Sequence, residues 1–235
     1  MTVSPITLHH EVPRDDLLLG VIKAAPVDCG PAPPALSAAL DDLVASVVEH
    51  GENPARVRRT KLCRDILRNG RYKPTGRGKP ASEYLLRAAG EGNFPRVNGP
   101  VDANNLVSLK HTAPISLWDL ERAGSNDFEF RLGGAGDTYV FNPSGQEMKL
   151  DDLVTGYARN ADGGLLPIVN PVKDSLKTKT TESSRFIAGC VYFPTEEGEA
   201  ALKELLEDFQ HWLRQCGLEV ETRHAVVRCG ASVTL

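Results

Sequence analysis

The chain has 235 residues, of which 41% are apolar and 25% are charged, with 21 Gly and 16 Pro. This composition is typical of a globular protein and excludes collagen-like, low-complexity and highly charged disordered chains. No run of about 18 apolar residues is present, and the N-terminal residues lack the basic start and apolar stretch of a signal peptide. We therefore expect a cytoplasmic protein without membrane contact.

The charge of the chain is unevenly distributed. Residues 54 to 87 hold eleven Lys or Arg and two acidic residues, a net charge of +9, so the rest of the chain carries −13 of the total of −4. A local basic surface can attract phosphate groups on an acidic protein, because nearby charges dominate the local potential. The alternative, which the sequence leaves open, is a solvated basic helix face.

The first third of the chain predicts two strands followed by helices. Short apolar runs at residues 6–12 and 17–22 predict the strands. Apolar residues spaced by three and four predict a helix over residues 35–50. A second helix is predicted over residues 54–69, and a Gly/Pro loop separates it from a third helix that Ser82 caps. We expect this basic region to bind RNA through Lys61, Arg64, Arg68 and Arg71 on the helix and through Lys73, Arg77 and Lys79 in the loop.

The remaining chain predicts one polar-containing helix and then mostly strands. A short helix is predicted near residues 101–109, with strands at 115–120, 128–132, 138–141, 165–169 and 186–193. An acidic amphipathic helix at 196–215 and a strand at 218–228 end the chain. With no internal repeat, these elements predict an α+β fold in one domain over residues 1–235.

Common catalytic and metal-binding motifs are absent from the sequence. It contains no GxSxG, no Walker A loop, no GxGxxG after a strand and no HExxH. The glycines between 133 and 136 predict a tight turn or a close approach of the backbone to a ligand. The five scattered cysteines form no CxxC pair, so we expect reduced, mostly buried thiols. We expect neither a metal nor another cofactor.

Two regions hold polar residues suited to chemistry. His111 is the one histidine within the polar set of residues 102–111, and the alternative interpretation is a half-buried residue at a helix end. Residues 173–185 interleave Lys173, Lys177, Lys179 and Arg185 with Asp174 and several Ser and Thr. This segment suits contacts with hydroxyl and phosphate groups, and a flexible surface loop has the same composition.

The sequence VDANNLVSLKHTAPISLWD at residues 101–119 resembles the VD-x-x-N-x-V-x-L-x-x-x-x-P-x-x-x-x-D pattern of the B3/B4 domain in the beta subunit of bacterial phenylalanyl-tRNA synthetase. Residues 128–131 and the stretch TESSRF at 181–186 extend the resemblance. The upstream stretches YKPTG, SEYLLR and FPRVN are similar to free-standing B3/B4 proteins. The resemblance covers roughly residues 55–193.

In the synthetase this domain removes wrongly attached tyrosine from the tRNA for phenylalanine. The resemblance therefore implies a layered B3/B4-type domain, a β-sandwich of short strands flanked by helices, with an aminoacyl-tRNA deacylase activity. It also implies a tRNA partner, and we expect no DNA partner. Ser116 stands where the synthetase motif has a His, so the tyrosine pocket is altered.

From the residues and the resemblance together, we predict a site between the helix near residues 101–111 and the segments holding Arg131 and residues 180–186. The candidate catalytic residues are Thr180, Thr181 and His111. The candidate substrate-binding residues are Asn104, Asn105, Lys110, Ser116, Arg131 and Ser184. Two alternatives stay open: a non-catalytic RNA-binding module, and a small-molecule hydrolase or binder, which leaves the basic segment unexplained.

Overall fold

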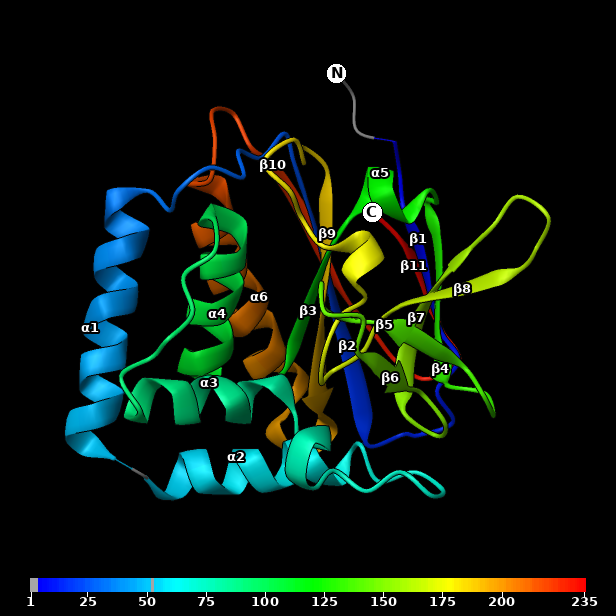
Figure 1. Ribbon diagram of the computed structural model, residues 1–235, viewed down its shortest axis with the longest axis horizontal. Coiled ribbons are helices and arrows are strands. Elements are labelled where there is room, and N and C mark those ends of the chain that lie inside the picture. Colours follow the sequence, from blue (N-terminus) through cyan, green and yellow to red (C-terminus); the bar gives the residue numbers. More distant parts are fainter. Residues whose placement is uncertain (1–3, 52) are drawn as a thin grey trace.

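The computed structural model describes residues 4–51 and 53–235 (Figure 1). Its elements, in chain order, are β1 (Thr7–His10), β2 (Leu17–Ala25), α1 (Pro34–His50), α2 (Pro54–Asp65), η1 (Gly76–Gly78), α3 (Ala81–Gly90), α4 (Gly99–His111), β3 (Ile115–Asp119), α5 (Leu120–Ala123), β4 (Asp127–Leu132), β5 (Thr138–Val140), β6 (Glu147–Lys149), β7 (Val154–Arg159), β8 (Leu165–Val169), η2 (Leu176–Thr178), β9 (Ile187–Pro194), η3 (Thr195–Glu197), α6 (Glu199–Arg214), β10 (Glu221–Val227) and β11 (Ser232–Thr234).

The strands form two larger sheets and a small hairpin. One sheet has the order β11-β1-β4-β7-β8, the other has the order β10-β2-β9-β3, and β5 pairs with β6. Figure 1 shows the four-stranded sheet with α4 and α6 against one face and the five-stranded sheet on the other, while α1 lies outside α4. The predicted α+β layered fold, with a β-sandwich and flanking helices, is confirmed.

Strand β2 shows why the four-stranded sheet is the middle layer. Its sequence, LLLGVIKAA, is apolar at nearly every position, and every residue is buried. Leu19 and Val21 pack in the core between the two sheets, whereas Leu18 and Ile22 pack under the helices. An unbroken apolar run of this kind is typical of a strand that is covered on both faces.

Strand β4 follows the alternating pattern of an outer sheet. Phe128 and Phe130 point into the core between the sheets, and both are fully buried. The Trp118 ring of β3 lies 5.3 Å from the Phe128 ring and 6.3 Å from the Phe130 ring, centroid to centroid. The Tyr192 ring of β9 lies 6.0 Å from that of Phe130. These aromatic side chains hold the two sheets together.

Helix α4 is buried on nearly all sides. Asn98 caps its start by accepting the Val101 N–H at 3.0 Å, and Thr112 ends it in a left-handed conformation with a φ of 53°. The helix lies among α1, α3, α6 and β3. A helix enclosed in this way needs no polar outer face, which explains why its apolar residues follow no single stripe.

Two sequence-based boundaries are wrong. The second helix ends at Asp65, not at residue 69, because the N–H groups of Leu67 and Arg68 bond to carbonyls three residues back and Gly70 takes a φ of 47°. Arg68 and Arg71 therefore lie beyond the helix. Ser82 does not cap α3, since it lies buried inside the first turn and no capping hydrogen bond is made.

The glycine-rich segment makes a close backbone approach to the chain itself, whereas the sequence predicts a tight turn or an approach to a ligand. A Cβ added to Gly133 would lie 2.0 Å from the Leu150 carbonyl oxygen, and Gly133 bridges to Asp151. Gly136 has a φ of 85°, which other residues rarely adopt. The segment joins β4 to the β5–β6 hairpin.

We expect Phe130→Ala to lower the free energy of unfolding by about 3–5 kcal/mol, because it leaves a cavity among Trp118 and Tyr192 in the core between the sheets. Urea denaturation followed by circular dichroism measures this change. Val97→Ala is the control, since Val97 is 63% exposed and should change stability by less than about 0.5 kcal/mol. A loss below 1 kcal/mol for Phe130→Ala would contradict the proposed packing.

Candidate functional site

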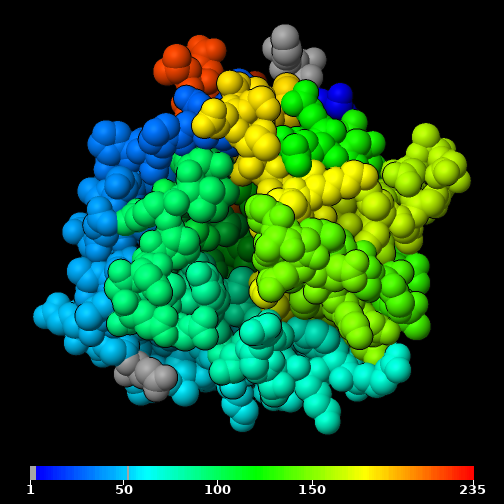
Figure 2. All heavy atoms as spheres, in the orientation of Figure 1, coloured from blue at the N-terminus to red at the C-terminus, as the bar shows by residue number. Residues whose placement is uncertain are grey.

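A basic groove lies along the helices α2 and α3. It has a volume of about 1440 Å³ and runs from the C-terminal end of α1 along α2 and α3 to the loop after β5. Its far wall includes Phe141, Lys173 and Lys179. Figure 2 shows the surface hollowed near the centre of this face, between the α3 and α4 region and the residues coloured as β5 and β6.

The groove is strongly positive. Among the described lining residues, nine are basic and two are acidic. Both acids are already paired: Glu83 with Arg64, and Asp65 with Arg68 at 3.0 Å. On the far wall, burial and then the charges of Arg77 and Lys179 lower the pKa of Lys173. Where neighbouring cations repel one another and no acidic side chain neutralises them, the binding of an anion is favoured.

Five of the seven residues predicted to bind RNA line the groove: Lys61, Arg64, Arg68, Arg77 and Lys79. The other two, Arg71 and Lys73, do not line it. The Arg71 guanidinium lies 3.6 Å from Asp151 and 3.7 Å from Asp152, on the side of the five-stranded sheet. The basic segment therefore divides between the groove and the neighbouring surface.

The basic residues of α2 also divide by helix face. Arg58 pairs with Glu196 at 2.7 Å and with Glu197, and Arg59 pairs with Glu197 as well. Arg59 also donates to the His111 carbonyl at 3.1 Å. These two arginines fix α2 to η3 and to the end of α4, so they are structural rather than available to a ligand.

A cluster of polar side chains lies beside the far wall of the groove. We name it the Asp174 cluster, and it consists of Ser116, Tyr139, Asn170, Asp174 and Tyr192. The Ser116 hydroxyl donates to the Asn170 carbonyl at 3.0 Å and lies 3.1 Å from the Tyr192 hydroxyl. The Tyr139 hydroxyl accepts from the Asn170 amide and donates to the Lys173 carbonyl at 2.6 Å.

Asp174 is the acidic member of this cluster and is half-buried. Its carboxylate accepts the Leu117 N–H at 3.2 Å and the Asn170 N–H at 3.4 Å. Burial raises the pKa of Asp174 to about 6, while the Ser116 hydroxyl, these two N–H groups and the Lys179 charge act in the opposite direction. A carboxyl group with a pKa near neutrality can take up and release a proton under physiological conditions.

The segment holding Thr180, Thr181 and Ser184 contacts the start of α4 and the end of β3. The Asn98 amide donates to the Thr180 hydroxyl at 3.2 Å. The Thr181 N–H donates to the Ser184 hydroxyl at 2.8 Å, and Ser184 in turn donates to Asp119. Asp119 is the last residue of the stretch that resembles the B3/B4 motif, and it also caps α5. The structure thus brings this segment to α4 as expected.

The other candidates on α4 point in different directions. Asn104 and Asn105 are each 8% exposed, and the Asn104 side-chain amide donates to the side-chain Oδ1 of Asn105 at 3.5 Å. Lys110 and His111 instead bond to Asp208 of α6, at 2.9 and 3.0 Å. Burial acts to raise the pKa of Asp208, yet the bonds from His111 and Lys110 bring it below its usual value. The half-buried position of His111 at a helix end matches the alternative interpretation.

Arg131 lies on the outer face of β4, opposite the core. It is exposed, and its guanidinium lies 3.5 Å from Glu129 on the same strand. No described residue of α4 or of the 180–184 segment forms a hydrogen bond or ion pair with it. The predicted convergence of Arg131 with these elements is therefore wrong, because side chains on β4 alternate and position 131 faces away from the core.

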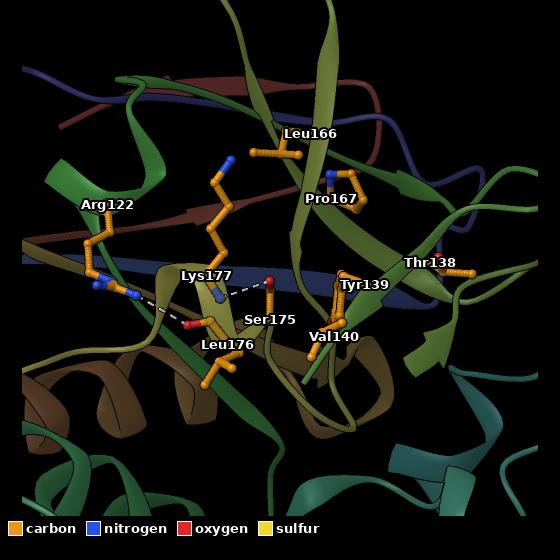
Figure 3. Close-up of a pocket in the computed structure, with 9 residues that line it drawn as sticks. All are labelled: Arg122, Thr138, Tyr139, Val140, Leu166, Pro167, Ser175, Leu176 and Lys177. Carbon is orange, nitrogen blue, oxygen red and sulfur yellow. Dashed lines mark hydrogen bonds between the residues drawn. The ribbon is translucent and has the colours of Figure 1, made fainter. Parts of the chain in front are cut away.

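A second, smaller pocket lies beside α5 and η2. It has a volume of about 420 Å³ and includes Arg122, Tyr139, Pro167 and Lys177 (Figure 3). The Arg122 side chain extends to the Leu176 carbonyl, at 3.4 Å. None of the candidate catalytic, substrate-binding or RNA-binding residues lines this pocket, although Lys177 belongs to the polar segment of residues 173–185. Tyr139 belongs both to it and to the Asp174 cluster.

The remaining sequence-based expectations concern metals, thiols and membranes. Within the described ranges, no group of three or more His, Cys, Asp or Glu side chains is arranged to hold a metal ion. All five cysteines are free, four buried and Cys229 exposed, which confirms the expected thiols. Of the helices in residues 4–51 and 53–235, none combines the length and the apolar character that a membrane crossing requires.

Comparison with known proteins finds a distant structural neighbour. No family model and no curated protein matches the chain. Among solved structures, the chain is similar to an N-terminal fragment of the phenylalanyl-tRNA synthetase beta subunit from Pyrococcus horikoshii, at 12% sequence identity and a TM-score of 0.42. The match covers 54% of this chain and 42% of that fragment.

Asp174→Asn tests the raised pKa of Asp174. Because the pKa rises from 3.8 to about 6 on folding, the folded protein holds a proton between about pH 4 and pH 6 that the unfolded chain has released. The wild type therefore loses up to about 3 kcal/mol of stability as the pH rises through this window, and the Asn variant does not.

We expect the free energy of unfolding of Asp174→Asn, relative to the wild type, to increase between pH 4 and pH 7. Urea denaturation at a series of pH values measures it. Asp162→Asn provides the control, since it makes the same chemical change at an exposed position. A pH-independent difference for Asp174→Asn would contradict the assignment.

Proposed function

We propose that the protein binds tRNA in the basic groove and hydrolyses the ester bond of a mischarged aminoacyl-tRNA, acting as an editing deacylase in trans. One observation supports this most directly: a groove with nine basic and two paired acidic residues ends at Lys173 and Lys179, next to the half-buried carboxyl group of Asp174. The resemblance of residues 101–119 to the B3/B4 motif agrees with this proposal.

The groove suits the polyanionic part of such a substrate. Lysine and arginine side chains neutralise phosphates and release counterions, which supplies affinity without reading sequence. Lys61, Arg77 and Lys179 form no ion pair with any described residue, so their charges are available. In this proposal the groove positions the acceptor end of the tRNA with its ester toward Lys173.

The Asp174 cluster suits the reacting end of the substrate. The ionised carboxylate would take a proton from a water molecule as the water oxygen attacks the ester carbonyl carbon. The bond between that carbon and the ribose oxygen then breaks, and the proton passes to the ribose oxygen. Amino acid and free tRNA are the products. An activated ester needs mainly an oriented water and a fixed substrate, which a general base and hydrogen-bonding groups can supply.

The residues predicted from the sequence are assigned within this scheme. Thr180 and Thr181 orient the water, while Ser116 and Ser184 shape the pocket through Tyr192 and Asp119. Asn104 and Asn105 stay candidates for contacts with the terminal nucleotide. Lys110 and His111 act through the bond to Asp208, which positions α4 against α6.

The second candidate function is a non-catalytic RNA-binding module. The groove alone supports it, because phosphate binding requires no reactive group. Ester hydrolysis over a panel of mischarged tRNAs distinguishes the two functions: a deacylase turns over at least one of them, and a binding module binds tRNA without turnover. A protein that neither binds nor hydrolyses any tRNA would exclude both.

Replacing Lys61, Arg68 and Arg77 together by Gln should weaken tRNA binding and reduce the slope of log K against log salt by about two to three units, since each lost phosphate contact removes about 0.7–0.9. Fluorescence anisotropy at several salt concentrations measures the slope. The matched control replaces three exposed cations outside the groove, Lys149, Lys203 and Arg214, with Gln. Equal slopes for the two triple variants would show that the groove is ordinary solvated surface and does not bind tRNA phosphates.

Asp174→Asn should lower the single-turnover rate of deacylation by about 100-fold or more, because the general base is lost, while tRNA affinity stays within a few-fold. Thr181→Val should lower the rate by about 10- to 1000-fold through the misplaced water. Asp162→Asn serves again as the matched carboxylate control. Parental rates in both Asp174→Asn and Thr181→Val would place the reaction elsewhere.

A further inference from the structure

The groove contains a second kind of surface that phosphate binding does not explain. Three of the large hydrophobic side chains that the structure leaves exposed lie together in its lining: Val48 at 57%, Val57 at 49% and Tyr84 at 52% exposure. They come from three consecutive helices, α1, α2 and α3. Single exposed apolar residues are ordinary, but a group of them inside a charged groove indicates a ligand with an apolar part.

Tyr84 is the aromatic member of this group. It lies on the outer face of α3, and its hydroxyl forms no hydrogen bond with any residue of the described chain. The Arg87 guanidinium, one turn later, lies over the ring at 5.6 Å from its centroid. Arg87 lies 3.8 Å from Glu91, which leaves it exposed and charged. The guanidinium covers one face of the ring, and the exposed remainder of Tyr84 is a surface on which a flat π system can stack.

The charges next to Tyr84 favour an anionic ligand. Glu83 precedes it, but this carboxylate is engaged by Arg64 and lies 4.0 Å from Lys79, so it does not repel phosphates. Lys61 of α2 also lines the groove. A ligand that presents both phosphates and flat, apolar bases matches this combination, whereas an acidic peptide supplies charges without a base to stack.

The ligand must offer unpaired bases. In a duplex the bases stack on one another and are closed to a protein side chain, whereas bases of a single strand are open to aromatic residues. We propose that the groove binds an unpaired RNA segment and that Tyr84 stacks on one of its bases. The inference rests on the proposed function in that it concerns the same groove, and it adds the single-stranded character of the bound segment and the residue that recognises it.

The test compares two chemical changes, one in the protein and one in the RNA. Affinities of a labelled single-stranded RNA of about eight nucleotides, and of the same backbone with abasic sites, are measured by fluorescence anisotropy at fixed salt. The wild type should bind the normal RNA about 5- to 100-fold more tightly than the abasic one. Tyr84→Ala should bind the two RNAs equally, and Tyr84→Phe should behave as the wild type.

Two controls distinguish the loss of base stacking from a change in the structure of the protein. Leu218→Ala removes a hydrophobic side chain that is 91% exposed and lies outside the groove, so it should preserve the preference for normal RNA. Circular dichroism and thermal unfolding verify that Tyr84→Ala is folded, as expected for an exposed helical position replaced by the best helix former. The slope of affinity against salt should be unchanged by Tyr84→Ala, because no charge is removed.

The outcomes separate this inference from the proposed function. If Tyr84→Ala retains the preference for normal over abasic RNA, or if a duplex or poly-glutamate competes as well as the single strand, the inference is wrong, even where tRNA is deacylated. If the Tyr84-dependent preference is present but no mischarged tRNA is hydrolysed, the inference holds and the proposed catalysis fails. No binding of the single-stranded RNA by the wild type overturns the inference.

Discussion

The burial of the four-stranded sheet on both faces is the constraint on which the other features depend. Strands β2 and β9 are buried along their whole length, with one face against the five-stranded sheet and the other under α1, α4 and α6. Because neither face of this sheet is exposed to solvent, functional groups can reach solvent only at its edges and beyond the ends of its strands. β3 is an edge strand, and Ser116 on it contacts the loop after β8, where Asp174 lies.

The helices create the groove because they are held by unequal forces. Helix α3 is fixed to α1 and α4 by a small apolar core that contains Val47, Leu85 and Leu109. Helix α2 buries mainly Cys63, and its other attachments are the ion pairs of Arg58 and Arg59 with η3 and of Arg64 with α3. Two helices joined by long charged side chains, rather than by close apolar packing, leave space between them, and that space is lined by the aliphatic stems and charged ends of the same residues.

Local sequence patterns predict much of this fold. Periodicity locates α1 and α6 to within a few residues, since each buries a regular set of apolar positions, and short apolar runs locate most strands. The elements β6, β7, β11 and α5 are missed; β6, β11 and α5 have only three or four residues, too few to show a period, and β7, VTGYAR, has no alternation because five of its six residues are buried. The end of α2 is missed for a different reason: Gly70 and the contacts of Asp152 decide it, and Asp152 is far away in the sequence.

The candidate site is less predictable than the fold, because the type of a charged or polar residue does not show which residue it contacts in the folded chain. Eleven basic residues within a short segment indicate an anion-binding surface, yet the sequence cannot separate Arg59, which Glu197 neutralises from a distance of more than one hundred residues, from Lys61, two positions later. Asp174 stands in a segment that also fits an exposed loop, and its role depends on Ser116, Asn170 and Tyr192, which only the folded chain places around it. Burial, not residue type, raises its pKa. A carboxyl group becomes a candidate base when the fold withdraws water from it and leaves a cation such as Lys179 close enough to keep it ionised at neutral pH.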